Sequence, residues 1–165
     1  MSRVIQKEVI LPASLAEVWD AWTTVPGVTT FFAPKAKVEL TIGGAYEMYF
    51  DPDAPPGSQG SEGCKVLSYL PQQMLSFDWS APPHLPNVRK ERTWVVILLE
   101  ELDERRVKVK LTHLGWRGGE EWDEAFRYFL RAWGTVLGRL EHRFSAGPID
   151  WNKPYVPPSV TPPQE

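Results

Sequence analysis

Cysteine, long apolar runs and clusters of positive charge are all scarce in this sequence. The single cysteine, Cys64, cannot form an internal disulfide, which favours a reducing compartment. Residues 1–10 lack the apolar stretch of a signal peptide, and no other stretch is long enough to span a membrane. The net charge is -3 and the lysines and arginines form no basic stripe. These absences predict a cytoplasmic protein with no membrane span and no nucleic-acid partner.

The proportions of hydrophobic and charged residues are those of an ordinary globular protein, and tryptophan and proline are frequent. A length of 165 residues fits one domain, and 42% hydrophobic and 24% charged residues are near the globular averages. Proline is dense after Gly147, where it breaks helices and sheets alike. We therefore predict a domain over residues 1–146. Residues 147–165 are predicted to be a proline-rich, extended or disordered tail that the fold does not need.

The local patterns alternate between strand and helix signals near the N-terminus and then favour strands. Residues 3–11 predict a strand, and Ser14 with Glu17 forms a capping box at the start of a short helix that Pro26-Gly27 ends. Residues 28–32 can form one more turn. Strands are predicted over residues 37–42, 46–50, 62–70, 75–80, 92–100 and 106–114, with loops at 51–60 and 81–87.

Residues 120–144 predict one long amphipathic helix, because apolar side chains recur at three- and four-residue steps. Strands followed by a segregated helix indicate an α+β fold. Val107, Val109, Leu111 and His113 share one face of their strand, so that face is expected to be buried. The fold class that follows is a curved antiparallel sheet of about six or seven strands wrapped around the C-terminal helix, with two short helices after the first strand.

Several stretches resemble one known superfamily. They are residues 14–22, Phe31-Phe32-Ala33-Pro34, residues 38–46 with Gly43-Gly44, residues 63–79 with Leu70-Pro71, residues 111–116 and the last helix. Together they are similar to the START-like (SRPBCC, helix-grip) superfamily. The closest resemblance is to the family of homologues of the activator of the heat-shock protein 90 ATPase (AHSA). The resemblance implies a hydrophobic pocket between the last helix and the sheet.

The aromatic and apolar side chains expected to face that space are the candidate ligand-binding residues. From sequence alone, filling the space and lining a cavity are equally good interpretations, and the resemblance favours the cavity. The predicted lining residues are Trp22, Phe32, Tyr46, Met48, Phe77, Trp79, Leu111, His113, Trp122, Phe126, Phe129 and Trp133. His113 fits a hydrogen-bonded core histidine better than a ligand anchor.

No set of residues has the spacing of a catalytic or metal site, so we predict no catalytic residues, no metal and no cofactor. The expected function is the binding of a small hydrophobic or aromatic ligand. The alternatives are a cyclase- or aromatase-like enzyme acting on an apolar substrate and a chaperone-binding module. The sequence does not identify the ligand.

Residues 92–100 carry apolar side chains on both faces of their strand, which predicts self-association. If Leu99 aligns with Val107, then Val95, Ile97 and Leu99 point inward and Trp94, Val96 and Leu98 outward. A register shifted by one residue would exchange the two sets. An exposed apolar row usually marks an interface, so a two-fold homodimer is expected.

Overall fold

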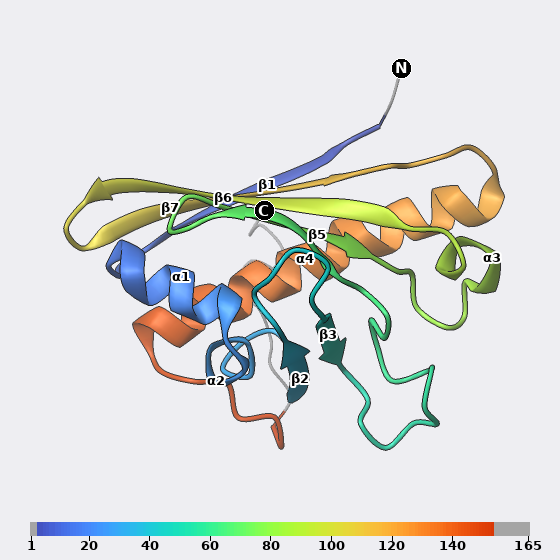
Figure 1. The fold of residues 1–165 in the computed structure, drawn as a ribbon, viewed down its shortest axis with the longest axis horizontal. Helices are drawn as coiled ribbons and strands as arrows, with labels where there is room; N and C mark the ends of the chain where they lie inside the picture. Colours follow the sequence, from blue (N-terminus) through green and yellow to red (C-terminus); the bar gives the residue numbers. More distant parts are fainter. Residues whose placement is uncertain (1–2, 154–165) are drawn as a thin grey trace, which may run out of the picture.

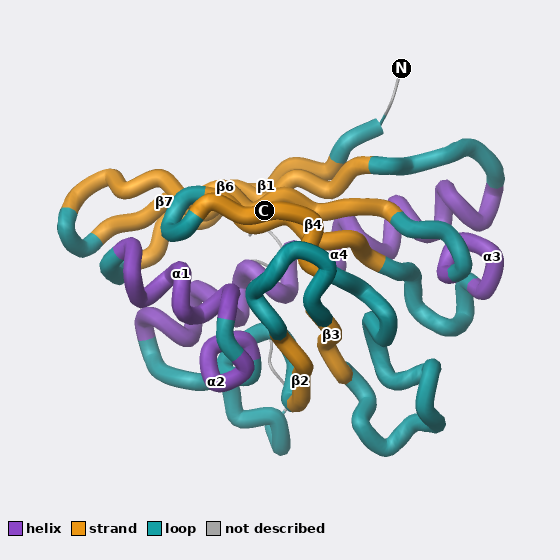
Figure 2. Tube along the Cα trace, in the orientation of Figure 1, coloured by secondary structure: helices purple, strands orange, loops and turns teal. Residues whose placement is uncertain are grey.

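A long helix lies against one face of an antiparallel sheet, and a smaller two-stranded sheet stands beside it (Figures 1 and 2). The structure, a computed structural model, describes residues 3–153. In chain order its elements are β1 (Ile5–Leu11), α1 (Leu15–Thr23), α2 (Val25–Val28), β2 (Lys35–Val38), β3 (Tyr46–Tyr49), β4 (Val66–Leu70), β5 (Met74–Trp79), α3 (Pro86–Arg89), β6 (Thr93–Asp103), β7 (Arg106–Leu114) and α4 (Glu120–Ser145).

The main sheet has five strands in the order β1-β7-β6-β5-β4, and each pair is antiparallel. The α+β helix-grip class is thus confirmed. The single sheet of six or seven strands is corrected, because β2 and β3 form a sheet of their own. Isolated bridges, Ala45 to Lys65 and Tyr49 to Gly60, connect β3 and its flank to the next segment. The proline- and glycine-rich chain after β3 interrupts a continuous ladder there.

The β6–β7 hairpin differs from its predicted register by two residues, since Leu99 pairs with Val109 rather than Val107. A shift by an even number leaves every side chain on its predicted face. Val95 and Ile97 are accordingly buried, whereas Trp94 and Leu98 lie on the outer face and are 42% and 43% exposed.

Helix α4 covers the inner face of the sheet, as the sequence predicted. Its 26 residues give a length of about 39 Å. Acidic side chains occupy its first turn and His142 and Arg143 its last, which complements the helix dipole. Its buried side chains are Ala125, Phe129, Trp133, Val136, Leu137 and Leu140.

The capping box at α1 is confirmed, because Ser14 Oγ accepts from the Glu17 amide at 3.2 Å and Glu17 accepts from the Ser14 amide at 2.9 Å. The short helix α3 was missed, since it begins inside the predicted loop 81–87 and continues to Arg89. Its proline stands at the first helical position, where the missing amide hydrogen costs nothing.

The first residues of the predicted tail pack on the domain. The Ile149 amide donates to the Thr30 carbonyl at 2.9 Å, and Trp151 Nε1 donates to the Thr29 carbonyl at 2.8 Å. Ile149 is only 8% exposed. The packed chain therefore continues past residue 146, and the rest of the predicted tail, residues 154–165, lies outside the described residues.

Candidate binding pocket

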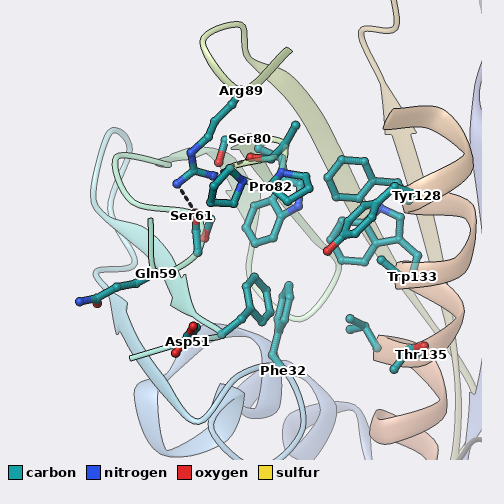
Figure 3. A pocket seen from close by; sticks show the side chains of 18 of the residues that line it. Phe32, Asp51, Gln59, Ser61, Ser80, Pro82, Arg89, Tyr128, Trp133 and Thr135 are labelled. Atoms are coloured by element: carbon teal, nitrogen blue, oxygen red, sulfur yellow. Dashed lines mark hydrogen bonds between the residues drawn. The ribbon is translucent and has the colours of Figure 1, made fainter. Parts of the chain in front are cut away.

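A pocket of about 640 Å³ lies between α4 and two loops, at the edge of the space between helix and sheet (Figure 3). Residues of α4 form its helix wall, and residues 50–61 and 80–83 form its loop wall. The main sheet contributes Trp79 at the end of β5. The space directly between helix and sheet, where the cavity was predicted, is filled by buried side chains, because the aromatic rings pack against one another there.

The floor of the pocket consists of four aromatic side chains, Phe32, Trp79, Phe129 and Trp133. The ring centroids of Trp79 and Trp133 are 5.6 Å apart, and Phe32 lies 5.6 Å from Trp79 and 5.9 Å from Trp133. None of the four is more than 5% exposed, so little of their surface reaches the open space. A ligand would rest on this surface and fill the groove above it.

His113 holds part of this floor from behind. Trp133 Nε1 donates to His113 Nδ1 at 2.9 Å, and because an indole nitrogen only donates, the histidine proton is assigned to Nε2. Nε2 then donates to Thr93 Oγ1 at 2.7 Å, and Thr93 Oγ1 donates to the Trp79 carbonyl at 3.4 Å. Burial lowers the pKa of His113 to about 3, so the imidazole is neutral. This chain links the two tryptophans of the floor.

The structure divides the predicted site residues into three groups. Phe32, Trp79, Phe129 and Trp133 line the pocket. Trp122 and Phe126 are half-buried beside Trp116, near the first turns of α4. The remaining predicted residues are fully buried in the core and absent from the pocket lining: Trp22, Tyr46, Met48, Phe77, Leu111 and His113.

Tyr46 is a predicted lining residue with a polar group, but the structure places it in the core. Its hydroxyl donates to the Trp22 carbonyl at 2.8 Å, and its ring stacks on Phe77 with centroids 4.3 Å apart. Burial raises the pKa of Tyr46 well above its ordinary value. Its donor is therefore committed to the core.

Arg89 and Glu62 fix the loop wall, and no local pattern in the sequence indicated this pair. Arg89 donates to the carbonyls of Ala81 at 2.6 Å, Gly57 at 2.6 Å and Gly60 at 2.9 Å, and its Nη2 is 3.4 Å from Glu62 Oε1. The density of proline and glycine marked residues 51–60 as a loop, but periodicity says nothing about where a loop lies. Partners up to 32 residues apart could not be found from local patterns.

The Glu62 carboxylate accepts hydrogen bonds from backbone amides of the same loop. It accepts from the amides of Gln59 at 3.2 Å and Gly60 at 2.8 Å, and also from that of Gly57. Burial raises the pKa of Glu62, but the hydrogen bonds from these amides outweigh that effect and leave the pKa below its ordinary value. The carboxylate is thus ionised at neutral pH and keeps its partners.

The described residues around the pocket include neither a metal-binding cluster nor a reactive thiol. Among residues 3–153, no cluster of three or more His, Cys, Asp or Glu side chains is arranged to hold a metal. Cys64 lies behind the lining residue Ser80, with 3.7 Å between Sγ and Oγ, and burial raises the pKa of its thiol to about 11. The thiol is protonated at neutral pH and unreactive as a nucleophile. No helix in the described part of the chain has the length and apolarity to cross a membrane.

The sequence matches the family described as "Activator of Hsp90 ATPase homolog 1-like protein" over residues 12–145. The chain belongs to this family. The match covers all four helices and every strand after the first, and it places the chain in the START-like superfamily, as the resemblance implied. No curated protein matches the sequence.

Solved structures share the fold of this family member at low sequence identity. A protein from Mesorhizobium loti has a TM-score of 0.68 at 18% identity, covering 85% of this chain and 95% of its own. The Aha1 dimer from Colwellia psychrerythraea has a TM-score of 0.67 at 17% identity, covering 88% and 98%. DynU16, from the dynemicin biosynthetic locus, has a TM-score of 0.65 at 20% identity, covering 88% of this chain and 48% of its own.

Proposed function

We propose that this protein binds a small apolar or aromatic molecule in the pocket between α4 and the loop wall. The observation that carries the proposal is an aromatic floor under an open volume of about 640 Å³. Ligand pockets commonly measure about 300–1,000 Å³ and are lined by apolar and aromatic groups with a few polar ones. Burial of apolar ligand surface would supply the driving force, at about 25 cal/mol per Å².

The fixed walls support this proposal, because a pre-organised pocket loses little entropy when a ligand binds. His113 ties together the two tryptophans of the floor, and Arg89 with Glu62 ties down the loop wall. The remaining roles of the predicted residues then follow from their positions. Phe32, Trp79, Phe129 and Trp133 contact the ligand, and the buried residues behind them support the floor.

Thermal shift in the presence of aromatic and aliphatic probes tests the proposal, because a ligand that binds the native state raises its stability. The variant Ala132→Trp fills the pocket from α4, where Ala132 is a half-buried lining residue. The control Leu130→Trp adds a similar ring to the same helix at an exposed position that does not line the pocket. We expect the shift to vanish in the first variant and persist in the second. No shift with any probe would contradict the proposal.

Two other functions are alternative outcomes of such a screen. DynU16 comes from a biosynthetic locus, so turnover of a bound probe would favour an enzyme. The family description names an activator of the Hsp90 ATPase, so capture of that chaperone by the purified protein would favour a chaperone-binding module. The lone buried thiol of Cys64 fits the cytoplasmic location that we propose for each of these functions.

We further propose that the outer face of the sheet mediates self-association. Trp94 and Leu98 on β6 are 42% and 43% exposed, and Leu70 at the end of β4 is 52% exposed. The structurally similar Aha1 protein from Colwellia psychrerythraea is a dimer. Sedimentation equilibrium of the wild type and of Trp94→Glu should show a dimer and a monomer, respectively. A monomeric wild type at micromolar concentration would contradict the proposal.

A further inference from the structure

The helix wall of the pocket changes from apolar to cationic between its floor and its rim. Trp133 lies at the floor, and Ala132 and Val136 lie one turn apart beside it. Arg131, Thr135 and Arg139 follow at four-residue steps, so they form one row along the helix. All of these residues line the pocket. A ligand on the aromatic floor would therefore have a row of guanidinium and hydroxyl groups at its outer edge.

The side chains that line the pocket include more cationic groups than anionic ones. Arg89 is occupied, because it donates to three carbonyls and lies 3.4 Å from Glu62. Asp51 on the loop wall is the carboxylate among the lining residues, and it lies across the pocket from Thr135 (Figure 3). The rim also carries the guanidinium groups of Arg131 and Arg139, and Arg131 is the exposed one, although the whole chain has a net charge of -3.

Arg139 at the rim packs against Trp151, in the segment that follows α4. Its guanidinium carbon lies 5.1 Å from the ring centroid of Trp151, whose Nε1 donates to the Thr29 carbonyl. Stacking on an aromatic ring leaves the charge of a guanidinium intact. Arg131, two row positions earlier, is exposed. Burial raises the pKa of the nearby Tyr128, and the charge of Arg131 lowers it by less.

We propose that the ligand is an anionic amphiphile. Its aromatic or acyl body lies on the floor, and its carboxylate or phosphate group lies at the rim beside Arg131. Arginine suits both oxyanions, because its planar fork pairs with two oxygens at once. This inference rests on the proposed function, since it assigns a chemical class to the molecule bound in the same pocket.

Matched probes separate the two proposals in one titration series. Decanoate, decyl phosphate and decanol share one ten-carbon chain, and naphthoate, naphthyl phosphate and naphthalenemethanol share one ring system. Isothermal titration of the full-length chain with each probe should show at least about tenfold tighter binding of the anionic members. The preference should shrink as salt is added, because screening weakens partly exposed charge pairs. Comparison of carboxylate with phosphate tells which oxyanion the rim prefers.

Arg131→Gln tests the position of the charge, and Arg127→Gln is its matched control. Both arginines are exposed on α4 one turn apart, but Arg127 does not line the pocket. Loss of the anionic preference in Arg131→Gln alone would support the inference. Equal loss in both variants would overturn it, because only the overall charge would then matter. Equal or tighter binding of the neutral probes would overturn it and leave the proposed function standing, whereas failure of every probe to bind would overturn both.

Discussion

The helix wall and the loop wall of the pocket differ in what holds them. The helix wall is held by apolar burial, with Phe129 and Trp133 pressed against the sheet and one indole hydrogen bond to His113. The loop wall is held by polar contacts that converge on Arg89 and Glu62. Apolar burial spreads the stabilisation of the helix wall over many contacts, whereas the stabilisation of the loop wall depends mainly on Arg89 and Glu62. Substitutions should therefore damage the two walls in different ways.

Replacement of Trp133 should cause the largest effect. Trp133→Ala removes a side chain that is 1% exposed and leaves His113 Nδ1 without its donor, so we expect a loss of about 3–5 kcal/mol in the free energy of unfolding. Denaturant titration measures it. Trp133→Phe keeps most of the burial and should lose about half as much. A loss below about 1 kcal/mol in the alanine variant would show that burial does not hold the helix wall.

Arg89→Met should loosen the loop wall and leave the helix wall in place. It removes hydrogen bonds to three carbonyls and the partner of Glu62, so we expect a loss of about 2 kcal/mol. Amide hydrogen exchange should accelerate at Gly60 and not at Trp133. Lys90→Met removes a neighbouring exposed cation and is the control. Equal exchange in the two variants would contradict the role of Arg89.

Acid should weaken the helix wall through His113. Its pKa is lowered from 6.5 to about 3 by burial, so the unfolded chain binds the proton first as pH falls. The contribution of neutral His113 to the free energy of unfolding is present above pH 6.5. It is lost as pH falls toward 3, at up to about 1.4 kcal/mol per pH unit. Between pH 7 and pH 5 the wild type should lose about 2 kcal/mol more than His113→Asn. Parallel pH profiles for the two proteins would rule this mechanism out.

Truncation after Ala146 should have the smallest effect. It removes the buried Ile149 and the indole hydrogen bond of Trp151, which predicts a loss of about 1–2 kcal/mol. A chain ending at Lys153 keeps both contacts and is the control. An unchanged melting temperature in the shorter chain would restore the original prediction that residues after 146 are dispensable for the fold.

Local patterns predicted those parts of the molecule that depend on near neighbours in sequence. The spacing of Phe129, Trp133 and Leu140 identified α4, and Ser14 with Glu17 identified the start of α1. The inward face of β6 survived an error of two residues in register, because alternation has a period of two. All four residues of the aromatic floor were among the predicted lining residues, since Trp79 follows the alternation of its strand and Phe129 and Trp133 follow the helical spacing of α4.

The loop wall, the separate two-stranded sheet and the docking of the segment after α4 depend on long-range contacts, which the periodicity of the sequence does not encode. Arg89 reaches Gly57 and Gly60 across about thirty residues, so the sequence could not place the loop wall over α4. The separate β2–β3 sheet depended on how far the ladder extends beyond β3, which propensity does not determine. Ile149 and Trp151 were assigned to the tail because of nearby prolines, although each has a defined contact on the domain.

The way in which the loop wall is attached makes it a suitable site for protein engineering. The Asp51 amide donates to the Gln59 carbonyl at 2.9 Å, so the base of the loop is closed before the chain reaches Glu62. Arg89 and Glu62 bind the segment from Gly57 to Gly60, and residues 52–56 form the tip beyond these anchors. Asp51 and Ser58 flank this tip and line the pocket, so libraries that vary the length and sequence of the tip would act on the lining through its flanks, while α4 and the anchoring pair stay untouched.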